Sequence, residues 1–110
     1  MESILTLIKK RVGIAEDDEH FDDDVLMEIN TAIMTLTQLG VGPSEGFVVK
    51  DKTNTWSEFI KDGSIMEGVK TYIYLSVKLA FDPPTNSFVV ESMERQKKEL
   101  EWRLNVASES

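Results

Sequence analysis

The most apolar segment of the chain ends at a pair of prolines. Residues 72–81 read YIYLSVKLAF, and Asp82-Pro83-Pro84 follows directly. Proline lacks an amide donor and pushes the residue before it out of the helical region, so a helix has to end here. The pattern Ser64-Ile65-Met66-Glu67 fits a capping box at a helix start. The sequence therefore predicts a central helix over residues 65–81, apolar on most sides and with Leu79 in the core, followed by a rigid corner.

Apolar residues at three- and four-residue steps predict two amphipathic helices in the first half of the chain. The first covers residues 3–12, between a serine that can cap it and a glycine that can stop it. The second covers residues 25–39 and shows the clearest apolar face. Acidic side chains crowd the stretch between them, residues 16–24. We expect Asp22 or Asp23 to cap the second helix, because carboxylates are favoured at a helix N-terminus.

The middle of the chain contains a turn and a short helix. Gly42-Pro43-Ser44-Glu45-Gly46 cannot continue a helix, and residues 47–51 can form a brief extended segment. A second capping box, Thr55-Trp56-Ser57-Glu58, predicts a helix of one or two turns that ends near Ile60. Trp56 is expected in the core.

A long helix is predicted after the prolines. Thr85 or Asn86 can cap it, and it reaches about Val106, which makes it roughly 30 Å long. Residues 107–110 are expected to fray. Its apolar seam is narrow and interrupted by polar side chains, so we expect the rest of the subunit to cover it only in part. The seam consists of Val89, Met93, Leu100 and Leu104, and the interruption consists of Gln96 and Lys97.

Together these segments predict an all-α fold, a small bundle of about four to five helices with a long C-terminal helix. A chain of 110 residues has the size of one domain, so residues 1–110 are expected to form a single helical domain around one core. No apolar run approaches the roughly 20 residues that a membrane-spanning helix needs, and no secretion signal is visible. We therefore expect no contact with a membrane.

The excess of acidic residues limits the kinds of molecule that the chain can bind. The formal net charge is −8, from 20 acidic and 12 basic residues. Such a field repels nucleic-acid phosphates, whereas DNA-binding domains usually present a basic patch. The absence of cysteine excludes disulfides, thiolate metal sites and thiol nucleophiles. Composition thus favours binding to other proteins.

The sequence contains no recognisable pattern for catalysis. His20 is the single histidine and stands among carboxylates, which is typical of a solvated loop residue. The run Asp22-Asp23-Asp24 lacks the alternate spacing, the glycine and the closing glutamate of an EF-hand, and no phosphate-binding loop occurs. We predict a protein that is not an enzyme and that has no catalytic residue, cofactor or metal site.

The candidate site is a set of protein-interface residues on the last helix. Trp102 is two positions from both Leu100 and Leu104, so it points away from the seam and lies either in the core or at an interface. The basic residues near it belong either to a solvated, ion-paired helix face or to a contact between subunits of unlike charge. The candidate interface residues are Arg95, Lys98, Trp102, Arg103 and Val106.

Five segments spread over nearly the whole chain carry a resemblance to a known family. They are the opening helix followed by Phe21-Asp22-Asp23, residues 38–47 (QLGVGPSEGF), residues 55–60 (TWSEFI), residues 72–85 (YIYLSVKLAFDPPT) and residues 98–104 (KELEWRL). In these segments the chain resembles the head-tail connector, or adaptor, proteins of long-tailed bacteriophages. The last segment is the most specific part of the likeness.

The resemblance implies a structural protein of the virion. Such a protein would dock on the portal protein at the head-tail junction, in a ring with neighbouring connector subunits that is twelvefold by analogy. It would extend the DNA channel, through which DNA passes without specific binding, and would hold the next neck or tail protein. Before assembly it would be found in the host cytoplasm. The segment from Phe88 onward would contact the portal or neighbouring subunits.

Two other classes of function fit the same helices. One is a small acidic regulatory protein that binds a single partner protein as a monomer or dimer. The other is a DNA-binding module in which residues 58–81 act as a helix-turn-helix, and the negative charge weighs against it.

Overall fold

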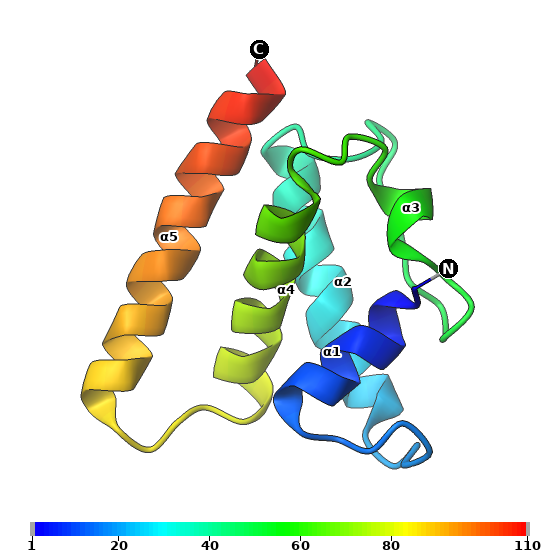
Figure 1. Cartoon of the computed structure of the whole chain (residues 1–110), viewed down its shortest axis with the longest axis vertical. Helices are drawn as coiled ribbons and strands as arrows, with labels where there is room; N and C mark the ends of the chain where they lie inside the picture. Colours follow the sequence, from blue (N-terminus) through cyan, green and yellow to red (C-terminus); the bar gives the residue numbers. More distant parts are fainter. Residues whose placement is uncertain (1, 110) are drawn as a thin grey trace.

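The chain folds into helices joined by loops, and the all-α prediction is confirmed (Figure 1). The structure, a computed structural model, describes residues 2–109. Within this range the only β-type pairing is an isolated bridge between Ser3 and Thr55. The helices are α1 (Ile4–Val12), α2 (Asp22–Gln38), α3 (Trp56–Phe59), α4 (Met66–Phe81) and α5 (Ser87–Glu109).

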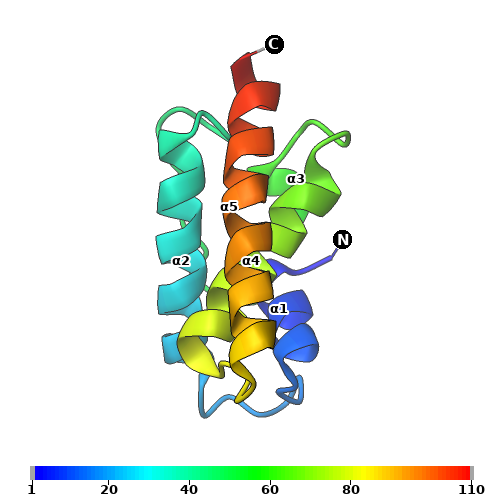
Figure 2. The ribbon, with the colours of Figure 1, turned by 90° about the vertical axis from the view of Figure 1, so that its left-hand side faces the viewer.

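Helix α4 lies at the centre of the fold, as its apolar sequence predicts. Helices α1, α2 and α5 all pack against it (Figures 1 and 2). Four of its buried residues, Val69, Tyr72, Ile73 and Val77, join one apolar cluster with residues of the other helices. Trp56 belongs to that cluster, as predicted. The most deeply buried members include Ile4, Ile8, Val25, Ile29, Ile33, Leu36, Phe59, Val69, Ile73 and Val77.

Leu79 is an exception to the predicted core. It is only partly buried and lies outside the apolar cluster. Leu79 comes one heptad after Tyr72, on the side of α4 that faces α5. Near this end, α5 offers Met93, which is half-buried, and Val89, which is largely exposed, so little apolar surface covers Leu79. The helix was predicted correctly, but its last turn is not interior.

The boundaries of α1 match their sequence signals, and the start of α2 does not. The Ser3 hydroxyl accepts the amide of Thr6 at 3.2 Å, and Gly13 adopts the left-handed conformation that ends the helix. Helix α2 begins at Asp22, after a Phe21 that makes no side-chain cap, so the prediction that Asp22 or Asp23 caps this helix was wrong. Both carboxylates lie inside the first turn, where the helix dipole still favours them.

Of two further predicted caps, the one at Ser64 is wrong and the one at Asn86 is present. Ser64 does not cap α4: its amide and its hydroxyl both donate to Asp62, at 2.9 and 2.7 Å, and α4 begins only at Met66. Asn86 does cap α5, because its Oδ1 accepts the amide of Phe88 at 2.8 Å.

The end of α5 runs further than predicted. The helix continues past Val106 to Glu109, so residues 107–109 are not frayed, and Ser110 lies outside the described residues. The Ser108 hydroxyl donates to the carbonyl of Leu39 at 2.8 Å, and the Asn105 amide donates to the same carbonyl at 3.1 Å. These bonds fasten the end of α5 to the end of α2.

Residues 47–51 form no strand, although Val49 is bonded much as a strand residue would be. The Val49 amide donates to Asn30 Oδ1 at 2.8 Å, and its carbonyl accepts from Asn30 Nδ2 at 3.0 Å. One side chain of α2 therefore satisfies both backbone groups, as a neighbouring strand would. This pairing holds the 45–48 segment beside α2.

Lys9 is a buried charge. Its side chain is 4% exposed, and its Nζ lies 2.8 Å from Asp22 Oδ1. The same Nζ donates to the carbonyl of Glu16 at 3.1 Å. Lys9 of α1 thus bonds to both Glu16 and Asp22 and ties the acidic stretch to α1.

Candidate protein-docking face on α5

Helix α5 is covered on one side only. It packs against α4, and Leu104 is its one buried residue among those described (Figure 2). Leu100 and Met93 are half-buried, and Val89 is largely exposed. This confirms the prediction that the subunit covers the apolar seam only in part.

The opposite side of α5 carries a row of exposed side chains, which we call the outer stripe. Trp102 is 67% exposed and Phe88 is 80% exposed, so the alternative that Trp102 lies in the core is wrong. Residues seven apart on a helix lie close to one line, which places Phe88, Arg95 and Trp102 on the same face, away from Leu104. The outer stripe consists of Phe88, Arg95, Lys98, Trp102 and Val106.

The structure thus brings together four of the five predicted interface residues, and Arg103 lies at the edge of the stripe. Arg103 forms an exposed ion pair with Glu99, at 2.6 Å, of the kind that contributes little to stability. Within residues 2–109, Arg95 and Lys98 have no carboxylate within 4.0 Å. Their charges therefore remain available to a partner. Phe88 belongs to the stripe by its exposure and spacing, although it was not among the predicted residues.

A buried tyrosine fixes how α5 is rotated on α4. The Tyr72 hydroxyl donates to Glu101 Oε2 at 2.8 Å, and Lys97 Nζ lies 5.6 Å from the Tyr72 ring centroid. Burial raises the pKa of Tyr72 above its ordinary value, and the hydrogen bond to the Glu101 carboxylate raises it further. Since Glu101 and Lys97 face α4, the outer stripe faces away from it. Sequence reasoning missed Tyr72 and Glu101, because no local pattern joins them.

Tyr72→Phe is expected to reduce the pH dependence of stability in alkaline solution. A folded-state pKa above the unfolded value of about 10 means that folding favours the neutral phenol. This contribution is complete below about pH 10 and is lost as the pH rises through the folded-state pKa. Near neutral pH the variant should lose about 1 kcal/mol, from the missing hydrogen bond.

Urea unfolding at about pH 8 and about pH 10.5 checks this, with Tyr74→Phe on the same helix as the control. The parent protein and the control should lose more stability between the two pH values than Tyr72→Phe does. An equal loss in all three proteins would show that the Tyr72 phenol does not resist ionisation.

The described part of the chain shows neither a metal-binding cluster nor a membrane-spanning helix. Within residues 2–109, no three acidic or histidine side chains are placed to hold a metal ion. The ring of His20 packs edge-on against Phe21 at 4.7 Å. None of the described helices combines the length and apolarity that crossing a membrane requires. Helix α4 cannot act as the recognition helix of a helix-turn-helix, because α1, α2 and α5 pack on it.

Comparison with protein families finds a match over nearly the whole chain. The family described as phage connector protein matches residues 4–110. The chain belongs to the phage connector protein family. Among curated proteins and among solved structures, none matches the connector significantly.

Membership confirms the resemblance found in the sequence. It gives the connector a structural part in the phage neck and implies contact with portal and tail proteins in the virion. The family is one of structural proteins and is not known for catalysis. The outer stripe on α5 is an exposed surface that is open to such contacts.

Proposed function

We propose that the connector docks on the portal as a ring, extends the DNA channel and offers the next neck or tail protein its attachment surface. The observation that carries this proposal is the outer stripe. It places a largely exposed tryptophan on the same face of α5 as exposed Phe88 and as two basic side chains, Arg95 and Lys98, that form no ion pair within residues 2–109. Exposed tryptophan and arginine are the residues that most often anchor protein interfaces.

The position of the stripe on one side of the subunit supports a ring. A stripe on one side of the subunit meets a different surface on the next copy, and contacts of this head-to-tail type generate rings when the rotation closes. The acidic charge of the chain suits a channel for DNA, because basic patches bind phosphate and would hold the DNA in place.

Trp102→Ala is expected to leave the subunit folded and to weaken its assembly on the portal at least tenfold. The side chain is exposed, so the fold loses little. A tryptophan buried at an interface is commonly worth about 2 kcal/mol or more, which exceeds a factor of ten in affinity. Co-sedimentation with the portal protein of the same phage, beside circular dichroism of the free chain, measures both effects.

Gln96→Ala is the matched control, since Gln96 is exposed on α5 but off the outer stripe. It should bind the portal as the parent protein does. Unchanged binding of Trp102→Ala would exclude the outer stripe as a docking face. A parent chain that does not bind the portal at all would support the regulatory alternative, in which this protein binds a single other partner.

A further inference from the structure

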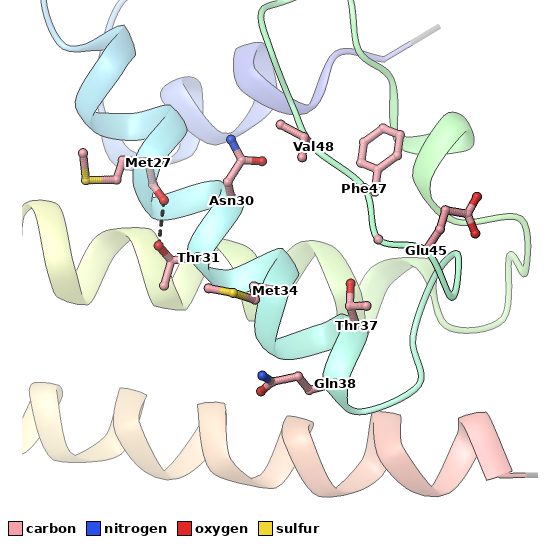
Figure 3. Close-up of a pocket in the computed structure, with 10 residues that line it drawn as sticks. Met27, Asn30, Thr31, Met34, Thr37, Gln38, Glu45, Phe47 and Val48 are labelled. Carbon is pink, nitrogen blue, oxygen red and sulfur yellow. Dashed lines mark hydrogen bonds between the residues drawn. The ribbon is translucent and has the colours of Figure 1, made fainter.

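A groove runs along α2 beside the 45–48 segment (Figure 3). It encloses about 600 Å³. Met27 and Met34 of α2 and Val48 of the segment line it, and all three side chains are largely exposed. Methionine side chains adapt their shape to an apolar partner. The groove is therefore an apolar surface without a partner inside the described chain.

The walls of the groove are held in place before any partner arrives. The paired hydrogen bonds between Asn30 and Val49 tie the segment to α2. The Thr31 hydroxyl, between the two methionines, donates to the carbonyl of Met27 at 2.9 Å. The hydroxyl is thus satisfied within its own helix, which leaves the floor suited to apolar contact.

The spacing of the groove matches that of the outer stripe. Met27 and Met34 are seven residues apart, as are Arg95 and Trp102. Seven residues of helix span about 10 Å, so two turns of one helix can lie along two turns of the other. Trp102 and Val106 of the stripe are apolar and four residues apart, which is a spacing at which a helix lays apolar anchors into such a groove.

The charges of the two surfaces are opposite. Glu45 is the one ionisable residue that lines the groove, and no cation lies within 4.0 Å of it in the described part of the chain. Asp23 and Asp24 are exposed in the first turn of α2, beyond Met27. The outer stripe carries Arg95 and Lys98. Electrostatic complementarity of this kind selects a partner and orients it.

We propose that the groove binds the outer stripe of α5 from a neighbouring copy of the connector. This inference rests on the proposed function and names the partner of its docking face. In Figure 3, α2 lies between the 45–48 segment and the α5 of the same chain, so that α5 leaves the groove open. Two different surfaces of one subunit then meet in a head-to-tail contact, which is the kind that builds a ring.

Cross-linking of introduced cysteines tests the proposal, because the chain has no cysteine of its own. Val106→Cys places a thiol at the end of the stripe and leaves Trp102 intact, and Thr31→Cys places one in the groove. Each variant is mixed with the portal protein and treated with a bismaleimide. The double variant should give a ladder of dimers, trimers and larger species. An equal mixture of the two single variants should give dimers only, and each single variant alone should stay monomeric.

The control pairs Val106→Cys with Lys10→Cys, an exposed position on α1, and should give no ladder. Dimers from Val106→Cys alone would show α5 pairing with α5 and would overturn the proposal. A cross-link from Thr31→Cys to the portal would assign the groove to the portal instead.

The outcome separates this inference from the proposed function. If the cysteine-bearing chains sediment with the portal but the double variant gives no ladder, the inference is wrong and portal docking stands. If they do not sediment with the portal and give no ladder, both are wrong. A ladder without portal binding would support the contact between copies alone.

Discussion

Ile73→Asp is expected to unfold the connector at ordinary temperature. Ile73 lies in the middle of α4 and is completely buried. Removing a buried isoleucine side chain costs about 2–5 kcal/mol, and an unpaired charge in its place costs several more. A domain of this size is stable by only about 5–15 kcal/mol. Circular dichroism of the purified variant should therefore show loss of most helical signal.

Leu79→Asp provides the matched control on the same helix. Leu79 is only partly buried and lies outside the apolar cluster, so an aspartate there keeps contact with water. We expect a loss of about 1–2 kcal/mol and a folded protein with a lower thermal midpoint. Equal damage from both substitutions would show that the core extends to the end of α4. A folded Ile73→Asp variant would contradict the central position of this helix.

The elements of this fold could be predicted where the signal is local. The periodic apolar residues of α2 and the proline pair after α4 act within a few residues, and the structure keeps both. Ser3 was correctly identified as a cap for the same reason, and Asn86 is the cap of the two candidates Thr85 and Asn86. Leu79 was misplaced because apolar character predicts a helix but does not reveal which of its turns the neighbouring helix covers.

The tertiary polar contacts could not be predicted, because their partners are distant in sequence. Asn30 and Val49 are 19 residues apart, and Tyr72 and Glu101 are 29 apart. Each pair depends on how two elements are placed, which no local pattern records. Asp22 illustrates the consequence. Its carboxylate was expected to cap α2 but forms an ion pair with Lys9 instead. Helix α2 therefore starts at Asp22 itself, one residue earlier than it would if Asp22 were the cap.

The outer stripe was largely predictable and the groove was not. The position of Trp102 relative to Leu100 and Leu104 was enough to place it off the seam, since helical geometry is fixed. The groove needs two elements, α2 and the 45–48 segment, and only folding brings them together. The one signal in the sequence was the pair Met27 and Met34, spaced by a heptad on the polar side of α2.

Lys9→Ala is expected to lower the free energy of unfolding by about 3 kcal/mol. Breaking a buried ion pair from one side typically costs about 3–5 kcal/mol, because a charge is left without its partner. We expect a loss at the lower end of this range, because the Asp22 side chain is 25% exposed and water still solvates its charge. The Glu16 carbonyl also loses its donor, and the aliphatic stem of Lys9 leaves a void beside α1.

Urea unfolding of a small set of variants separates charge from packing in this effect. Lys10→Ala, the exposed neighbour, should change stability by no more than about 0.5 kcal/mol. Lys9→Met keeps the apolar stem and should lose less than Lys9→Ala. Adding Asp22→Asn to Lys9→Met should restore part of the stability, because the unpaired carboxylate is then gone. If Lys9→Ala and Lys10→Ala were equally stable, the position of the acidic stretch would not depend on the ion pair between Lys9 and Asp22. The apolar face of α2 alone would then determine where this helix begins.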